Sequence, residues 1–260
     1  MYYVVATGAM RRRGFAAGRR ADRCRWLWLI PVLAAQVQAA PLLLDSGPAQ
    51  VSLLELYTSQ GCSSCPPAER WLNAWVDDAR LWRDLVPLAL HVDYWDYLGW
   101  RDPFASAEYG ARQRAYASAG RARGVYTPGF FLNGREWRGW TLRLPPRASG
   151  SEPGRLVARI DGRRLTAAFP SDGMPLELHF AVLGCGIETP VRQGENRNRT
   201  LRQDFVVLQH GKHAAPDGHW DIELPASAAT AADRFGIALW VSHAGELRPL
   251  QATGGWLPAD

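Results

Sequence analysis

Residues 51–68 of the 260-residue chain read VSLLELYTSQGCSSCPPA. The run Val51–Ser59 is short and apolar, which is typical of a buried β-strand. Gly61 interrupts it, and two cysteines, Cys62 and Cys65, follow with two residues between them. Two prolines come next, and a helix tolerates them in its first turn because amide hydrogens there have no partner within the helix. This stretch predicts a buried strand that leads through a Cys-x-x-Cys loop into a helix.

The hydrophobic pattern downstream alternates between helical and extended segments. Apolar residues repeat at helical spacing from Ala68 to Ala79. The further predicted elements are a buried strand at 85–92, an aromatic loop at 94–104, a helix at 105–119, a strand at 130–132 and, after the turn Asn133-Gly134, a strand at 136–140. This order is typical of an α/β fold, so we expect an α/β domain over residues 48–144.

Prolines and glycines become frequent between Pro145 and Gly154, which indicates a domain boundary. Beyond it the apolar residues mostly alternate with polar ones, as they do in half-buried strands. The predicted strands lie at 156–160, 164–169, 176–182, 220–224 and 235–241. We therefore expect a smaller all-β, sandwich-like domain over residues 155–257.

The N-terminus has the composition of a targeting segment. Residues 1–39 hold seven arginines, one acidic residue, the apolar run Trp26–Ala35 and then the small residues Val37 and Ala39 at signal-peptidase spacing. They predict a signal peptide over residues 1–39 and a periplasmic or secreted protein that touches the membrane only before cleavage. An uncleaved anchor is the alternative. The rest of the chain has 23 basic and 24 acidic residues, which gives no indication of nucleic-acid binding.

The cysteine pair is the strongest candidate for chemistry. The unpaired amide hydrogens and the dipole at a helix N-terminus stabilise a thiolate, which is the attacking species in disulfide exchange. Cys62 is then the nucleophile, and Cys65 is the resolving thiol that attacks the mixed disulfide on Cys62. A static disulfide and half of a zinc site are the alternatives. Zinc needs two further ligands, and apart from Cys185 the remaining candidates are histidines scattered along the chain. We expect no metal and no other cofactor.

Longer motifs show a resemblance to a known family. The run Glu55–Ala68 resembles secreted bacterial proteins catalogued as domain of unknown function 1223, a family placed among thioredoxin-like folds. Further segments similar to that family are His91–Phe104, Arg112–Tyr116, Val125–Pro128, Gly194–Asn196 and Thr200-Leu201. The resemblance covers most of the chain after the signal peptide. It implies a thioredoxin-like fold for residues 48–144, but no settled substrate.

The thioredoxin-like resemblance implies roles for three more residues. Pro128 matches the cis-proline that faces the cysteine pair, and the backbone of Thr127 would then pair with an extended peptide substrate. An ordinary turn proline is the alternative. Thioredoxins also carry a buried Asp in the strand before the cysteines, and this chain has none there. We hypothesise that Glu55 replaces it as the proton acceptor; a structural, hydrogen-bonded Glu55 is the alternative.

Three weaker signals lie elsewhere. The aromatic loop holds Trp95 and Trp100, which we assign to substrate binding because ligands bind α/β folds at the carboxyl ends of strands. Packing against the core is the alternative for both. His91 is either a soft-metal ligand beside the cysteines or a structural residue, and Cys185 is either a third redox thiol or an inert buried one.

Together these features predict an exported thiol–disulfide oxidoreductase. Its partners would be protein thiol or disulfide substrates, or small thiols, and a protein that recycles the redox state of Cys62 and Cys65. Two alternatives stay open. Reduced Cys62 and Cys65 would also suit Cu(I), a soft ion, in a copper-handling protein. The chain would otherwise be a non-catalytic interaction module whose disulfide only fastens the start of the helix.

Overall fold

The computed structural model describes residues 40–226 and 230–258, so the predicted signal peptide lies outside the described residues. The described residues cluster into one compact unit. In the described ranges, no helix is long and apolar enough to cross a membrane. The helices are α1 (Pro66–Asn73), α2 (Ala107–Ser118) and two 3-10 helices, η1 (Asp93–Leu98) and η2 (Gly139–Leu142).

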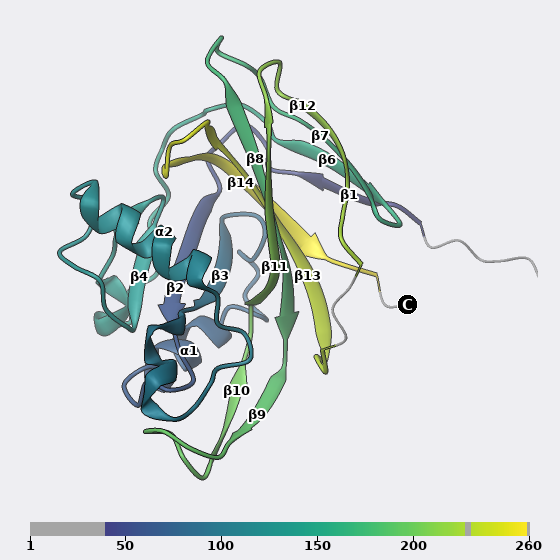
Figure 1. Cartoon of the computed structure of the whole chain (residues 1–260). Coiled ribbons are helices and arrows are strands. Elements are labelled where there is room, and N and C mark those ends of the chain that lie inside the picture. Colours follow the sequence, from purple (N-terminus) through teal and green to yellow (C-terminus); the bar gives the residue numbers. More distant parts are fainter. Residues whose placement is uncertain (1–39, 227–229, 259–260) are drawn as a thin grey trace, which may run out of the picture. The chain divides into compact units, whose positions relative to one another are not determined.

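The described residues form three β-sheets (Figure 1). The strands of the largest sheet, in spatial order, are β14 (Pro249–Trp256), β13 (Arg234–His243), β8 (Leu176–Cys185), β11 (Val206–Ala215), β3 (Leu85–His91), β2 (Ser52–Thr58), β4 (Gly129–Leu132) and β5 (Arg135–Glu136). The second sheet contains β1 (Leu42–Asp45), β6 (Val157–Asp161), β7 (Arg164–Ala168) and β12 (His219–Glu223). A hairpin of β9 (Ile187–Val191) and β10 (Arg199–Gln203) forms the third.

The predicted fold class, an α/β thioredoxin-like domain followed by a smaller all-β domain, is wrong. The protein is mostly β-sheet, and two α-helices and two short 3-10 helices are the only helices among the described residues. Strands β2 and β3 pair in parallel, as an α/β order requires, but they belong to one eight-stranded sheet with β8, β11, β13 and β14.

The prediction of two separate domains fails because the edge of β3 that does not pair with β2 needs another partner. Ala89 donates its backbone N–H to Phe205 O at 2.8 Å, and Val206 of β11 pairs with Ala89 in parallel. An unpaired strand edge in a protein interior would leave backbone polar groups unsatisfied. Strand β11 therefore completes β3 and continues the sheet through β8 and β13. Local periodicity carries no information about a pairing between segments so far apart in the chain.

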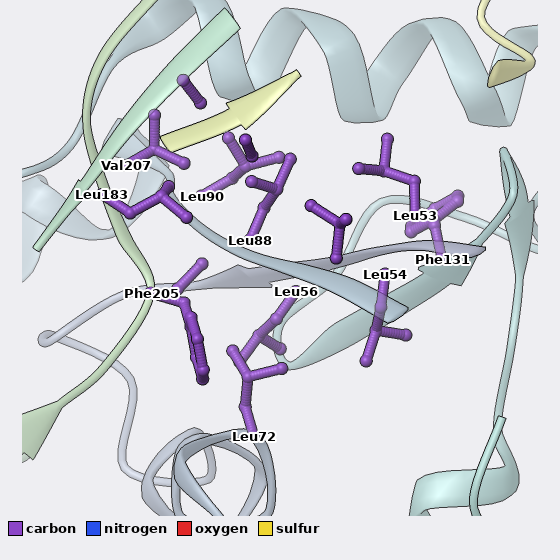
Figure 2. Packing of buried hydrophobic residues seen from close by; sticks show 14 of the residues in the cluster. Leu53, Leu54, Leu56, Leu72, Leu88, Leu90, Phe131, Leu183, Phe205 and Val207 are labelled. Carbon is purple, nitrogen blue, oxygen red and sulfur yellow. The ribbon is translucent and has the colours of Figure 1, made fainter. Parts of the chain in front are cut away.

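The main hydrophobic core also draws on both halves of the chain. Figure 2 shows Leu56 and Leu88 from the parallel pair, Leu72 from α1, and Leu183 and Phe205 from the second half within one cluster. A second core cluster includes Leu44, Leu165 and Trp220 from the four-stranded sheet together with buried residues of β8 and β13. The four-stranded sheet thus packs on the far end of the large sheet.

The apolar spacing predicts a helix as far as Ala79, but α1 ends at Asn73. The Asn73 side chain donates to Arg202 O at 2.9 Å and accepts from the backbone N–H of Asp204 at 3.2 Å. These bonds tie the helix end to the chain that follows β10. The strand expected at 136–140 is also wrong, since β5 ends at Glu136 and η2 begins at Gly139.

A buried ion pair joins β2 to α2. The Glu55 carboxylate, fully buried, accepts from Arg112 Nε at 2.6 Å and from the Tyr116 hydroxyl at 2.6 Å. Burial acts to lower the pKa of the Arg112 guanidinium, but the Glu55 carboxylate and the hydroxyls of Tyr116 and Tyr57 outweigh it and hold that pKa well above its usual value. Removing one member of such a pair leaves an uncompensated charge in the core.

We expect Glu55→Gln to lower the free energy of unfolding by about 3 to 5 kcal/mol, because Arg112 then stays buried without its counter-charge. Urea denaturation measures this change. Glu152→Gln, a surface substitution at an exposed residue, is the matched control and should change stability by less than about 0.5 kcal/mol. Equal stability of the two variants would contradict a stabilising ion pair between Glu55 and Arg112.

Candidate functional site

Cys62 and Cys65 form a disulfide in the connection from β2 to α1, with their Cα atoms 5.5 Å apart. Cys65 is the N-cap residue of α1, and its carbonyl accepts from the backbone N–H of Ala68 at 2.9 Å and of Glu69 at 3.1 Å. The Ser64 hydroxyl lies 3.3 Å from Cys62 Sγ. Both cysteines are 0% exposed, whereas Ser63 and Ser64 between them are exposed. The disulfide is therefore inaccessible to solvent, although the turn between its two cysteines lies at the surface.

The loop between β9 and β10, residues 192–198, lies over this connection, and we call it the strap. Asn196 is fully buried, and its amide donates to Gln60 O at 2.9 Å and to Cys62 O at 2.8 Å. Glu195 Oε2 accepts from the backbone N–H of Ser63 at 2.9 Å and from its hydroxyl at 2.7 Å. These bonds to Ser63 lower the pKa of Glu195. The strap thus binds the backbone on both sides of Cys62.

Gln60 connects the cysteine loop to three other segments. Its side-chain amide donates to Gln203 Oε1 at 2.8 Å and to Thr189 Oγ1 at 3.1 Å, both in the β9–β10 hairpin. Its side-chain oxygen accepts from Trp100 Nε1 at 3.1 Å, and its backbone N–H donates to Asp102 Oδ2 at 2.8 Å. This buried side chain has a partner for every polar atom, which fixes the loop that precedes Cys62.

Three buried titratable groups lie beneath the loop: Glu69, His91 and Asp102. His91 Nδ1 is 2.7 Å from Asp102 Oδ2, the same oxygen that binds the Gln60 N–H. Burial acts to lower the pKa of His91, but the attraction of the Asp102 carboxylate and of Glu69 outweighs it and raises that pKa. Burial acts to raise the pKa of Asp102, and His91 with the backbone donors outweighs it, so this pKa is lowered.

Glu69, in α1, is a buried acidic residue on the cysteine side of the sheet. Its Oε1 accepts from Thr58 Oγ1 at 2.7 Å and from Gln203 Nε2 at 2.8 Å. Burial raises its pKa, and the nearby His91 opposes that shift. The sequence analysis did not select Glu69, although it stands four residues after Cys65, one helical turn, and that spacing was a usable signal.

The structure does not bring Glu55 to the cysteines. Side chains alternate between the two faces of a strand. Thr58 faces α1 through Glu69, so Glu55 faces the opposite side, where Arg112 and Tyr116 of α2 bind it. The hypothesis that Glu55 accepts a proton from the cysteine pair has no contact to support it.

The bond between Thr127 and Pro128 is cis, as the sequence predicts. Trp95 links this bond to the cysteine loop, since its Nε1 donates to Thr127 Oγ1 at 2.7 Å. A Cβ at Gly61 would lie 3.3 Å from Trp95 Cβ, tighter than ordinary contact, so glycine leaves room for this tryptophan. Thr127, Trp95 and Trp100 are thus brought to the surroundings of the cysteines, and their role in substrate binding stays a prediction.

One further candidate, Cys185, lies apart from this site. It is buried in the main core, where its sulfur accepts from the Phe205 N–H at 3.2 Å and burial raises the pKa of the thiol to about 12. No group of three or more His, Cys, Asp or Glu residues in the described part of the chain is arranged to hold a metal ion.

We expect Asn196→Ala to speed reduction of the Cys62–Cys65 disulfide by dithiothreitol about tenfold. Loss of its two bonds to buried carbonyls costs the closed strap about 1 to 3 kcal/mol and raises the open population. Stopped alkylation of the released thiols, followed by mass spectrometry, measures the rate. Gln193→Ala, an exposed substitution in the same loop, is the control. Equal rates for both variants would show that the strap does not limit access.

We expect the free energy of unfolding to fall as the pH rises above 6.5. The pKa of folded His91 is raised above its ordinary 6.5, so its stabilisation is complete below 6.5 and is lost as the pH passes the folded value. Urea titrations at each pH measure the slope. His91→Gln should remove the slope, and His219→Gln, which alters an exposed histidine, should keep it. A slope that survives His91→Gln would refute the assignment.

Comparisons with known proteins support the family resemblance that the longest motifs indicate. The chain covers 94% of a crystal structure of a protein from Agrobacterium tumefaciens over 80% of its own length, with 26% identity and a TM-score of 0.58. It also resembles HBP35 of Porphyromonas gingivalis in fold, with 16% identity, a TM-score of 0.52 and coverage of 80% of this chain and 76% of that one. None of the curated proteins matches. The sequence model of one family matches residues 53–242, so the chain belongs to DUF1223, a family described as a protein of unknown function.

Proposed function

We propose that the protein is an exported thiol–disulfide oxidoreductase that exchanges its Cys62–Cys65 disulfide with protein or small-thiol substrates. A thiolate of the substrate attacks Cys62, a mixed disulfide forms, and Cys65 leaves as a thiolate that takes up a proton. A second substrate thiolate then attacks its own half of the mixed disulfide and releases Cys62. The substrate dithiol becomes a disulfide, and the cysteine pair becomes a dithiol. The reverse sequence reduces a substrate disulfide.

The observation that carries the proposal is the position of the disulfide at the start of α1, with Cys65 as N-cap. A helix start stabilises the thiolate that exchange requires. A disulfide between residues three apart closes a very small loop, which stabilises a fold by only about 2 kcal/mol on the chain-entropy relation, against about 4.7 kcal/mol for a 100-residue loop. The disulfide therefore contributes little to the stability of the fold.

Export is part of the same proposal. The arginine-rich, then apolar segment at residues 1–39 is typical of a signal peptide, and disulfides persist in the oxidising compartments that such a signal leads to. A periplasmic or secreted protein would meet both the substrates and the recycling partner that the chemistry needs.

The covered disulfide sets a condition on this chemistry. Cys62 is 0% exposed, so an attacking sulfur reaches it only after the strap or the Ser63-Ser64 turn moves. The strap is held here by the bonds of Asn196 to Cys62 O and of Glu195 to Ser63, and a few hydrogen bonds of this kind can break by local opening without unfolding of the whole protein. We propose that exchange proceeds through this opening.

The same burial favours a second candidate, a non-catalytic interaction module in which the disulfide only fastens the start of α1. Its disulfide would resist reduction and stay oxidised in the presence of thiol buffers. The copper-handling alternative has no comparable observation in its favour.

The reduction potential of Cys62–Cys65 separates the two candidates. We expect a value between about −120 and −270 mV after equilibration in glutathione buffers, the range of exchange catalysts, with each cysteine counted by a mass tag. Cys62→Ser should abolish exchange with a dithiol peptide, whereas Ser63→Ala should retain it. A potential below about −300 mV, or exchange that survives Cys62→Ser, would overturn the oxidoreductase in favour of the stapled module.

A further inference from the structure

Exposed residues lie on the segments that neighbour the covered disulfide. Tyr97, at the end of η1, is 81% exposed, and Leu98 beside it is 36% exposed. A Cβ at Gly99 would lie 3.7 Å from Gln193 Oε1, and one at Gly194 would lie 3.1 Å from Trp100 Cβ. The end of η1 therefore packs against the strap, and the strap in turn binds Ser63. We call the exposed Tyr97, the strap and the exposed Ser63-Ser64 turn the rim.

The strap is positively charged on its outer side. A depression of about 560 Å³ is lined by Arg192, Gln193, Gly194, Glu195, Arg197 and Asn198. Within the described ranges, the guanidinium groups of Arg192 and Arg197 form no ion pair and no side-chain hydrogen bond, and both residues are exposed. The carboxylate that lines the depression, that of Glu195, is already engaged with Ser63. This charge is local, because residues 40–260 hold 23 basic and 24 acidic residues.

We propose that this rim binds an acidic, cysteine-bearing segment of a partner protein, an inference that rests on the proposed function. Arg192 and Arg197 pair with carboxylates of that segment, since a guanidinium binds a carboxylate through two parallel hydrogen bonds. Tyr97 supplies the exposed aromatic contact that is common at the centre of protein interfaces. The partner cysteine then lies beside the Ser63-Ser64 turn.

This arrangement couples recognition to access. The seven-residue strap carries both the unpaired arginines and the contacts of Glu195 and Asn196 that hold the Cys62 loop. A partner that pairs with Arg192 and Arg197 therefore acts on the segment that must move before Cys62 is reached. Two arginines on a chain that is otherwise balanced in charge favour an acidic peptide over a nucleic acid, which needs many phosphate contacts.

Two peptides of identical length test the inference. Each has one cysteine, flanked by four aspartates in the first and by four lysines in the second. The rate at which each reduces the oxidised protein is divided by its rate with the neutral hydroxyethyl disulfide, which removes differences in thiol reactivity. We expect the aspartate peptide to react about tenfold faster in 20 mM salt and the preference to vanish in 500 mM salt. Arg192→Glu with Arg197→Glu should reverse it.

Arg83→Glu with Arg147→Glu is the matched control, because both residues are exposed and the change in net charge is the same. This variant should keep the preference. Equal corrected rates of the two peptides with the wild-type protein would overturn the inference while leaving exchange itself established.

Cysteine-to-serine versions of both peptides separate recognition from exchange. Fluorescence anisotropy should show binding of the aspartate version only, and this binding should be lost in Arg192→Glu with Arg197→Glu. Absence of binding would overturn the inference whatever the outcome for exchange. Binding without exchange by any thiol would support the inference on its own and count against the proposed function. Displacement of the peptide by an RNA oligomer at equal concentration would assign the rim to nucleic acid and overturn it.

Discussion

The backbone pairing between Ala89 of β3 and the Phe205-Val206 segment is the contact on which the architecture depends. It satisfies the edge of a buried parallel strand, and it is the point where the two halves of the large sheet meet. The β9–β10 hairpin comes directly before this segment along the chain. The pairing therefore also brings the β9–β10 hairpin to the side of α1 (Figure 1).

Buried polar groups then determine the details of that end. Gln60, Glu69, His91 and Asp102 are all buried, and each accepts or donates hydrogen bonds within one network. A buried polar group without partners is costly, so the network has few alternative arrangements. His91 Nε2 has no partner among the described residues, the one exception in this group. It lies in a set that is otherwise fully bonded and that supports the loop before Cys62.

Through the strap, the second half of the chain contributes residues to the candidate site. Cys62 and Cys65 come from the first half, yet Asn196 and Glu195 bind the backbone around Cys62. A strap of this kind restricts access to the disulfide by hydrogen bonds that are weak enough to break individually. It also brings arginines to a position where they meet whatever approaches the cysteines. The access and the recognition that we propose thus share one short segment of chain.

The sequence by itself determined several local elements and the close pair of cysteines. The apolar run before Cys62 forms β2, the prolines after Cys65 begin α1, the bond before Pro128 is cis, and the long motifs assign the family. The strand and the helix start depend on near neighbours along the chain, which hydrophobic periodicity and proline placement report well, whereas the cis bond and the family follow from the family resemblance. The sequence also singled out Gly194–Asn196 as a motif, but without a chemical role.

Only the tertiary structure decided how these elements combine. The continuous sheet depends on a long-range pairing that local patterns do not encode, so the two-domain fold class was wrong. The face of β2 on which Glu55 lies, and hence its pairing with Arg112 in place of the cysteines, follows from which helix covers which side. The role of Asn196 required the strap to fold back over a loop more than 130 residues earlier. Contacts between distant segments are set by packing and by the satisfaction of buried backbone groups, which are properties of the whole chain.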